Sequence, residues 1–403
     1  MLSVNEARER ILSQIKITAT ESVALNDSLN RVLAKELFAD SDYPPFDNSA
    51  VDGFAIKADN GGSNRTLKVV ADIPAGTSPT VILNAGEAAR IMTGAQLPQG
   101  ADCVVPVEET DFNDRKAGTA PPKTVTIDKQ MSVGDNIRPR GMDMRLGDIV
   151  LNKGRTLKPQ DLGLAATLGY AEVSVHKKPR VTLMSSGDEL LSAGAPLEPG
   201  KIRDSNSYTL AALVLNVGAE VVRLGVARDT RESVTNLLEK AANERADLIL
   251  SSAGVSVGAF DFIKEVIDAN GKLDFWKVNM RPGKPLAFGE YRGIPFIGLP
   301  GNPVSAFVGF EVFVRPALLH MSGAMDGTRL KVKVRCAEEV VSDGRESYLR
   351  ARIRLVNGIP SAFLTGHQGS GNLLSLVQAD ALLIIPAGVK CLPAGSEVDA
   401  IFI

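Results

Sequence analysis

The stretch Arg180-Val-Thr-Leu-Met-Ser-Ser-Gly-Asp-Glu189 decides the fold, because an apolar run suited to a buried strand ends in a turn of small and acidic residues. The same order of elements recurs to about residue 323. Strands are expected at 180–185, 220–226, 247–252, 273–279 and 294–299, and helices at 207–216, 231–245, 262–269 and 304–320. Parallel strands need crossover connections, which are usually helices that cover the sheet. The pattern therefore predicts a doubly wound α/β domain whose ligand binds beyond the carboxyl ends of its strands.

The sequence on either side of this region is predicted to be mainly β-structure. The pair Ser3 and Glu6 forms a capping-box pattern, which predicts an amphipathic helix over residues 3–15. Short apolar runs between turn residues predict strands at 67–70, 88–92, 103–107 and 124–127. After residue 327, strands are expected at 331–335, 348–355, 361–364, 381–385 and 397–402. These last strands predict a small C-terminal β-barrel or sandwich.

Length and composition limit the class of protein. A chain of 403 residues can hold several domains, and 44% hydrophobic with 23% charged residues is ordinary for folded proteins. The net charge of −2 gives no sign of a nucleic-acid partner. The apolar stretch at 304–314 is shorter than the roughly 20 residues that span a bilayer, so no membrane segment is expected. The N-terminus lacks a signal-peptide pattern and the three cysteines are scattered, which predicts a cytoplasmic location.

Four strand ends in the α/β region carry the same kind of loop. The loops lie at 185–189, 227–230, 251–258 and 298–303 and are rich in glycine and serine or in turn-forming residues. Small residues let a ligand approach backbone N–H groups, and the N-terminus of a following helix favours an anion. Glycine and serine also end strands that bind nothing, so one such loop is weak evidence. Four of them on one edge of a sheet predict a phosphate-binding rim.

Carboxylates lie on or beside these loops and would repel a phosphate unless a cation lay between them. They are Asp188, Glu189, Asp229 and Asp261. Mg²⁺ binds through one or two carboxylates together with substrate phosphates, so a magnesium site is expected. Two of the acids have structural alternatives: Asp229 could cap a helix with Glu232 at the third position, and Asp261 precedes the helix expected at 262. Glu189 has no such alternative.

Two further segments carry clustered polar residues. In 276–285, Lys277, Arg281 and Lys284 surround a turn stiffened by prolines, which would suit an oxyanion. The alternative is a solvated loop. The segment 46–54 is rich in turn-forming Asp, Asn and Ser, and by itself it indicates Asx-turn chemistry.

Seven motifs in order resemble the molybdopterin molybdenumtransferase family, which includes MoeA and the gephyrin E domain. They are Asp47-Asn-Ser-Ala-Val-Asp-Gly-Phe-Ala55, Arg90-Ile-Met-Thr-Gly-Ala95, Ser186-Gly-Asp-Glu189, Ala253-Gly-Val-Ser-Val-Gly258, Pro282-Gly-Lys-Pro285, Leu299-Pro-Gly-Asn-Pro-Val-Ser305 and Thr365-Gly-His-Gln-Gly-Ser370. The resemblance implies that adenylylated molybdopterin is cleaved and molybdate inserted, with AMP released and Mg²⁺ assisting. It also implies a homodimer that receives its substrate from a molybdopterin adenylyltransferase.

The resemblance further implies a division of the chain and a set of site residues. The expected parts are an N-terminal helix at 1–20 that packs on the α/β domain, an elongated linking domain at 21–45 and 140–178, a β-rich inserted domain at 46–139, the α/β domain at 179–325 and the C-terminal barrel at 326–403. The expected catalytic residues are Asp52, Thr93, Asp143, Glu189, Asp229, Asp261 and Lys277, with Glu189, Asp229 and Asp261 as metal ligands. The expected binding residues are Ser186, Gly187, Asp188, Gly254, Val255, Ser256, Gly258, Arg281, Lys284, Pro285, Gly301, Asn302, Ser305, Arg350 and Ser370.

Two positions depart from the commoner family pattern. Arg281 stands where lysine is usual, which exchanges a point charge for a planar fork. Ala253 stands where glycine is usual, which adds a Cβ beside the expected ligand. The choice between molybdate and tungstate stays open. Two alternative functions also stay open, a gephyrin-like scaffold that binds peptides and a pterin adenylyltransferase.

Overall fold

The computed structural model describes residues 1–58, 64–112, 119–252, 259–325 and 327–403, and for 259–261 it describes the backbone alone. The chain forms two compact units. The first unit consists of residues 1–35, 153–162 and 171–403, and the second consists of 36–152 and 163–170.

A six-stranded sheet is the centre of the first unit. Its order is β15-β12-β16-β20-β19-β17, with β15 Glu220–Ala227, β12 Arg180–Ser186, β16 Leu248–Ser252, β20 Ile294–Leu299, β19 Pro285–Tyr291 and β17 Gly271–Lys277. The first four strands are parallel, whereas β19 is antiparallel to both of its neighbours. Since β17 reverses direction again, it ends at the same edge of the sheet as the parallel strands.

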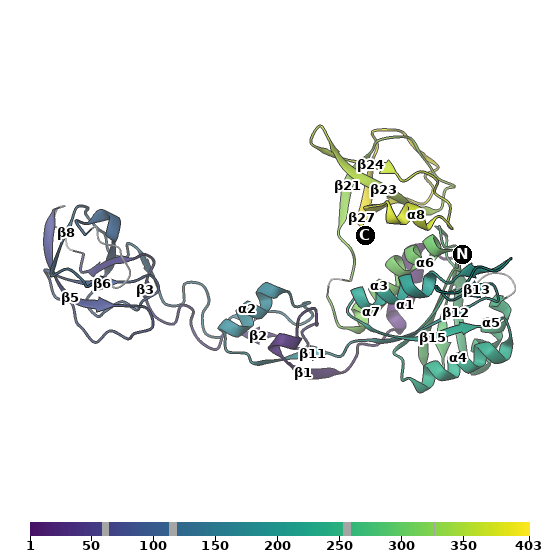
Figure 1. Ribbon diagram of the computed structural model, residues 1–403, viewed down its shortest axis with the longest axis horizontal. Coiled ribbons are helices and arrows are strands. Elements are labelled where there is room, and N and C mark those ends of the chain that lie inside the picture. The colour runs from purple at the N-terminus through teal and green to yellow at the C-terminus, as the bar shows by residue number, and fades with distance from the viewer. Residues whose placement is uncertain (59–63, 113–118, 253–258, 326) are drawn as a thin grey trace. The chain divides into compact units, whose positions relative to one another are not determined.

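Helices cover both faces of this sheet, as alternation along the strands requires. Leu183 of β12 and Leu250 of β16 belong to one core, and Met184 and Ile249 belong to another. Helices α1 Val4–Gln14, α3 Asn206–Asn216, α6 Pro303–Gly309 and α7 Arg315–Met321 contribute to the first core, and α4 Arg231–Asn243 and α5 Ala259–Asn270 to the second (Figure 1). The doubly wound α/β prediction is confirmed.

Every strand and helix predicted in this domain is present, with ends shifted by a few residues. The sequence prediction missed β19. Two prolines and one glycine lie in the segment that ends at Pro285, so the start of this strand was interpreted as a loop. The apolar residues that follow, Leu286, Ala287 and Phe288, are all fully buried. This strand makes the edge of the sheet antiparallel, so β17, β19 and β20 follow one another without covering helices between them.

Helix α1 begins with the predicted capping box. The backbone N–H of Glu6 donates to Ser3 Oγ at 3.2 Å, and the backbone N–H of Ser3 donates to the Glu6 carboxylate at 2.8 Å. Val4, Ala7 and Ile11 are buried against the first core. The helix is therefore held both by its cap and by its apolar face.

Replacing Ser3 with alanine is expected to lower the free energy of unfolding by about 1 kcal/mol, because the backbone N–H of Glu6 loses the Ser3 hydroxyl that accepts from it. Urea denaturation followed by circular dichroism measures the change. Ser13→Ala is the matched control, since the Ser13 hydroxyl only donates to the Arg10 carbonyl on the exposed face. Equal effects of the two substitutions would contradict a role for the cap.

The segment from α6 to α7 is continuous and includes a π-helical turn, Phe310–Val314. This helix of 19 residues, Pro303–Met321, is long and apolar enough to cross a membrane, so the apolar stretch is longer than the expected 304–314, although the helix itself was expected at 304–320. However, 78% of it is buried inside the protein, where Phe310, Phe313 and Leu318 fill the first core. Burial of this kind is typical of a core helix.

The C-terminal strands close into a barrel, as predicted. The order β23-β24-β21-β27-β25 returns to β23, with β23 Glu346–Val356, β24 Ile359–Leu364, β21 Lys331–Cys336, β27 Glu397–Phe402 and β25 Ala381–Ile385. A short strand from the α/β region, β18 Met280–Arg281, pairs in parallel with β23. Helix α8 Leu373–Val377 and the pair β22 Val340–Val341 and β26 Cys391–Leu392 complete this part.

The first unit has two further strand pairs. β1 Thr20–Ala24 is antiparallel to β11 Glu172–His176, and β13 Leu190–Leu191 is parallel to β14 Ile202–Arg203.

The second unit is β-rich, in agreement with the sequence. Its main sheet has the order β7-β4-β6-β5-β8, with β7 Cys103–Pro106, β4 Gly53–Ile56, β6 Glu87–Ile91, β5 Arg65–Ile73 and β8 Thr124–Ile127. Smaller pairs join β3 Asn48–Ser49 to β9 Ile137–Arg138, and β2 Leu37–Phe38 to β10 Ile149–Leu151. Helix α2, Pro159–Thr167, was not predicted and contributes residues to both units.

Candidate functional site

Four predicted loops leave the α/β sheet at one edge. In the strand register, Ser186 lies opposite Ala227, Ser185 opposite Ser252, and Ser252 opposite Leu299. These residues are the last ones of four parallel strands, so the loops that follow them start side by side. The predicted rim is therefore present as a geometric feature of the described strand ends.

Acidic residues gather at the β12 and β15 end of the rim. The backbone N–H of Asp229 lies 3.4 Å from Asp188 Oδ1. Burial raises the pKa of the Asp229 carboxyl, and the charges of Asp188 and Glu189 raise it further. Asp229 Oδ1 is buried and has no hydrogen-bond partner in the described part of the chain. A carboxylate surrounded in this way favours a cation or a proton.

Asp229 does not cap helix α4, so the alternative role that the sequence allowed for it is wrong. Thr230 is the N-cap of α4, because its hydroxyl accepts from the backbone N–H of Ser233 at 3.3 Å. Asp229 stands one residue before the cap and is left without that local role. Its position is better explained by the acidic cluster than by helix capping.

Gly187 lets the Glu189 side chain fold back over the rim. Its φ of +143° lies in the region that favours glycine, and a Cβ there would stand 2.6 Å from Glu189 Oε2. The turn is fixed by the Gly187 N–H, which donates to the Ala227 carbonyl at 3.2 Å, and by the Ile202 N–H, which donates to the Glu189 carbonyl at 2.9 Å. Glycine is favoured here by its φ, whereas the exposed Glu189 side chain could move away from a Cβ.

Cationic and hydroxyl residues converge at the other end of the rim. The β18–β23 pairing places Arg281 opposite Ser347 in the strand that contains Arg350. A Cβ on Gly283 would lie 3.7 Å from the Ser305 carbonyl, and the Val304 N–H donates to the Ser370 carbonyl at 3.0 Å. Three segments distant in the sequence thereby meet at one place.

Arg350 is the most unusual residue of this group. Its side chain is fully buried, yet the described partners of its guanidinium are neutral. Nε donates to Ser375 Oγ at 3.0 Å, and Nη2 donates to the carbonyls of Gly369 at 3.0 Å and His367 at 3.4 Å. Nη1 has no hydrogen-bond partner among the described residues. Burial and, to a smaller extent, the Arg281 charge together lower the pKa of Arg350 to about 10. A buried guanidinium without a carboxylate is costly unless an anion binds to it.

Lys277 and Lys284 lie beside this group and away from the acidic cluster. Lys277 ends β17, which is four strands from β12, a separation of about 19 Å at normal strand spacing. Its ammonium lies 4.0 Å from the ring centroid of Trp276, and the Lys284 carbonyl accepts from the Val278 N–H. Lys277 thus joins the cationic end of the rim, with Pro285 at the start of β19.

The second unit holds a separate group of predicted residues. Asp52 Oδ1 accepts from the Thr93 backbone N–H at 2.6 Å and from its hydroxyl at 2.7 Å. The backbone hydrogen bond from Thr93 is the main cause that lowers the pKa of Asp52. Asp143 instead accepts from Arg138 at 2.8 Å. The structure therefore brings Asp52 and Thr93 together within this unit.

Models of three protein families match the chain in order. They are described as the MoeA N-terminal region (domain I and II) over residues 2–169, a probable molybdopterin binding domain over 182–320 and the MoeA C-terminal region (domain IV) over 333–403. A molybdopterin molybdenumtransferase from Staphylococcus aureus (strain COL) is 37% identical over 408 residues, covering 99% of this chain and 95% of that protein. The chain belongs to the molybdopterin molybdenumtransferase family.

Other relatives agree with this membership. The molybdopterin molybdenumtransferase of Nostoc sp. (strain PCC 7120) is 37% identical and covers 94% of this chain and 88% of its own. A crystal structure of molybdopterin biosynthesis MoeA protein from Pyrococcus horikoshii OT3 is 31% identical, with a TM-score of 0.85 over 100% of both chains. The chain is accordingly a MoeA-like enzyme of molybdenum cofactor biosynthesis.

Some predicted site residues fall outside the described part of this MoeA-family chain. Gly254, Val255, Ser256 and Gly258 lie there, and so does the side chain of Asp261, although its backbone belongs to the first turn of α5. Within the described residues, no group of three His, Cys, Asp or Glu side chains is arranged to hold a metal ion. The predicted trio of metal ligands stays a prediction, because Asp261 is one of its members.

The sequence analysis missed polar residues that position the rim. Asp204 is buried and accepts from the Ser185 hydroxyl at 3.1 Å, and the Asn206 amide donates to the Gly301 carbonyl at 2.7 Å. Gln368 brackets the Arg350 backbone, accepting from its N–H at 2.9 Å and donating to its carbonyl at 3.1 Å. In the sequence, Asp204-Ser-Asn206 resembles an ordinary helix cap. Only the burial of Asp204 and Asn206 in the structure shows that they contact the rim. Asn302 caps α6 without a side-chain hydrogen bond to the helix.

Proposed function

We propose that this enzyme cleaves adenylylated molybdopterin and inserts molybdate, releasing AMP. The observation that carries the proposal is the buried Arg350, whose Nη1 has no hydrogen-bond partner among the described residues, with Arg281 close enough to lower its pKa. Two neighbouring cations, one of them with a buried donor that has no described partner, suit a tetrahedral oxyanion. Family membership supports the same assignment.

The two ends of the rim would serve different parts of the substrate. The strand-end loops at 186–189 and 299–302 would receive the phosphates on backbone N–H groups, together with the buried Ser186 hydroxyl, which has no described partner. Arg281, Lys284, Ser305, Arg350 and Ser370 would hold molybdate beside the dithiolene. Lys277 would add a further positive charge at the cationic end of the rim. The catalytic roles of Asp52, Thr93 and Asp143 stay part of the proposal, supported by the ionised state that Thr93 gives to Asp52.

The acidic cluster is suited to Mg²⁺. Asp229 has an unpartnered buried oxygen and two acidic neighbours whose charges oppose its ionisation, so a divalent cation would relieve an existing repulsion. Glu189 and Asp229 would hold the ion, with Asp261 as the third ligand. When bound, Mg²⁺ neutralises charge that develops on phosphate oxygens. The protein itself orients the phosphates by the fixed turn at Gly187.

Addition of Mg²⁺ is expected to raise the thermal unfolding midpoint of the wild-type protein, because the ion binds only the folded acidic cluster. In Asp229→Asn the midpoint is expected to be slightly higher without Mg²⁺, since the repulsion is gone, and the gain from Mg²⁺ should shrink. Differential scanning calorimetry with and without Mg²⁺ measures both effects. An equal gain in the two proteins would place the cation elsewhere.

The assay that tests the function supplies purified protein with adenylylated molybdopterin and molybdate. Release of AMP together with molybdenum cofactor is the expected result. Consumption of ATP with formation of adenylylated molybdopterin would indicate an adenylyltransferase. Binding of a peptide with neither reaction would indicate a scaffold.

We also propose that the chain works as a homodimer in the cytoplasm and receives adenylylated molybdopterin from a separate molybdopterin adenylyltransferase. The family resemblance supports these points. Sedimentation equilibrium tests the dimer, and a mass of one chain at micromolar concentration would contradict it.

A further inference from the structure

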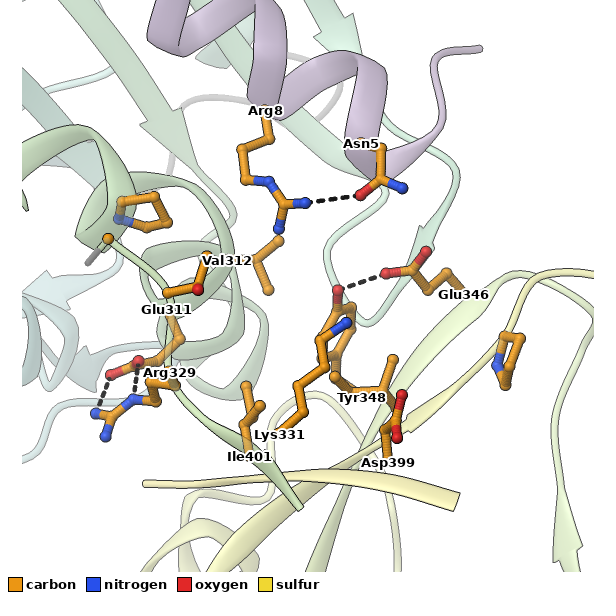
Figure 2. Close-up of a pocket in the computed structure, with 15 residues that line it drawn as sticks. Asn5, Arg8, Glu311, Val312, Arg329, Lys331, Glu346, Tyr348, Asp399 and Ile401 are labelled. Atoms are coloured by element: carbon orange, nitrogen blue, oxygen red, sulfur yellow. Dashed lines mark hydrogen bonds and ion pairs between the residues drawn. The ribbon is translucent and has the colours of Figure 1, made fainter. Parts of the chain in front are cut away.

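A cavity of about 240 Å³ lies in the first unit, lined by α1, the π-helical turn between α6 and α7, and the barrel (Figure 2). It shares no lining residue with the candidate site. Its walls include Arg8 of α1, Val312 of the π-helical turn, and Lys331, Tyr348 and Ile401 of the barrel. The cavity is thus a second candidate binding site, built from elements distant in the sequence.

The floor of the cavity is apolar and firmly packed. Val312, Tyr348 and Ile401 are at most 7% exposed and belong to the first core. Ile384 and Pro316 complete the apolar lining. An apolar floor that is already ordered can receive an apolar group without rearrangement.

The acids around the cavity already have partners. Glu311 accepts from Arg329 Nε at 2.6 Å and from Arg329 Nη2 at 2.9 Å. Asp399 pairs with Lys333 at 2.8 Å, and Glu346 accepts from the Tyr348 hydroxyl at 2.5 Å. The carboxylates at the wall are therefore partly or fully satisfied, and two of the three are neutralised by a cation.

Two cations at the rim of the cavity have no carboxylate partner in the described structure. Arg8 Nη2 donates to the neutral Asn5 Oδ1 at 2.8 Å, and Lys331 forms no ion pair with a described acid. Figure 2 shows the Arg8 side chain extending from α1 and the Lys331 side chain from the barrel toward the same space. Burial raises the pKa of Tyr348 while the Arg8 charge acts in the opposite direction, so this charge reaches the cavity floor.

We propose that this cavity binds a small organic anion, in which an apolar body about the size of one ring rests on Val312, Tyr348 and Ile401 while a carboxylate or phosphate is held by Arg8 and Lys331. The apolar floor would bind the apolar body of such a ligand, and the two cations would bind its anionic group. Because the ligand contacts α1, the π-helical turn and the barrel together, its binding stabilises the packing of the barrel on the α/β core.

The test uses the full chain and phenyl phosphate as the probe, titrated by isothermal calorimetry, with benzoate and inorganic phosphate in parallel. Phenyl phosphate or benzoate is expected to bind more tightly than inorganic phosphate, since only these reach the apolar floor. Arg8→Gln and Lys331→Gln are each expected to weaken binding roughly tenfold or more. Lys16→Gln, which removes an exposed charge from the chain just after α1, is the matched control and should leave the affinity unchanged.

Binding of phenyl phosphate in this cavity must be distinguished from binding at the candidate functional site, because that site also attracts anions. Arg281→Gln is expected to leave the affinity for phenyl phosphate unchanged, whereas Arg8→Gln should leave turnover with adenylylated molybdopterin unchanged. Equal affinity for phenyl phosphate and inorganic phosphate, no binding of either aromatic anion at millimolar concentration, or unaltered binding in Arg8→Gln would each overturn the proposal. This inference does not rest on the proposed function.

Discussion

Glu189→Gln is expected to reduce cofactor synthesis by about 10² or more while the protein stays folded. The Glu189 side chain is exposed and folds back over Gly187, where its charge raises the pKa of Asp229. Glutamine keeps the shape but removes the anion that would hold Mg²⁺ or move a proton. Rates of AMP release under saturating molybdate measure the effect.

The same substitution should leave stability unchanged or slightly improved. An exposed side chain with no described hydrogen bond contributes little to folding, and the loss of one negative charge relieves the repulsion at Asp229. Glu198→Gln is the matched control, because Glu198 is an exposed acid in the same connection after β13. A rate near that of wild type in Glu189→Gln would remove Glu189 from the catalytic group, and a lowered unfolding midpoint would point to a structural role.

The α/β fold was predictable because its signal is local and repeated. Each strand ends in small residues and each helix has its own apolar spacing, so the order of elements and the shared edge of the four loops follow from the sequence. The strand β19 was missed because Pro285 and its neighbours are typical of turns, and only burial in the sheet shows that Leu286 to Phe288 form a strand. Tertiary packing overrode the local signal there.

The cation group shows why site residues are harder to predict than folds. Arg350, Arg352 and Arg354 alternate in β23 and therefore share a face, so the sequence gives no reason to separate them. The structure buries Arg350 alone, because the turn at 366–370 places the Gly369 carbonyl over it and Gln368 binds its backbone. Long-range contacts of this kind leave no periodic pattern in the sequence. The family resemblance made Arg350 a candidate, and its burial without a carboxylate partner is the physical reason to expect that it binds an anion.

The acidic cluster illustrates the opposite case, in which a local pattern was misleading. Asp229 and Glu232 have the spacing of a capping box, yet Thr230 takes the cap position one residue later. This shift frees Asp229 for the rim, where its repulsion with Asp188 and Glu189 lowers stability in the absence of a cation. Groups with such unfavourable ionisation are often functional, because selection for stability alone would remove them.

Arg281→Gln is expected to raise the molybdate concentration needed for half-maximal activity by roughly ten- to hundredfold, since one charge-assisted contact contributes about 1.5 to 3 kcal/mol. Affinity for adenylylated molybdopterin should stay close to that of wild type. Arg335→Gln, which removes an exposed arginine from β21 of the barrel, is the matched control.

The unfolding midpoint distinguishes a loss of molybdate binding in Arg281→Gln from a folding defect. The Arg281 charge lowers the pKa of the buried Arg350 and also lowers the pKa of Asp343. Removal of Arg281 relieves a repulsion and loses an attraction, so the unfolding midpoint should stay close to that of wild type. Arg350→Lys keeps the buried charge but loses the planar fork, so it should also weaken molybdate binding. Ser375 and Gly369 lose their guanidinium donors in this variant. If Arg281→Gln weakened molybdate and the pterin substrate equally and also unfolded earlier, these residues would be structural. A selective loss of molybdate with an unchanged or higher midpoint would mean that the protein tolerates two repelling cations because an anion binds between them.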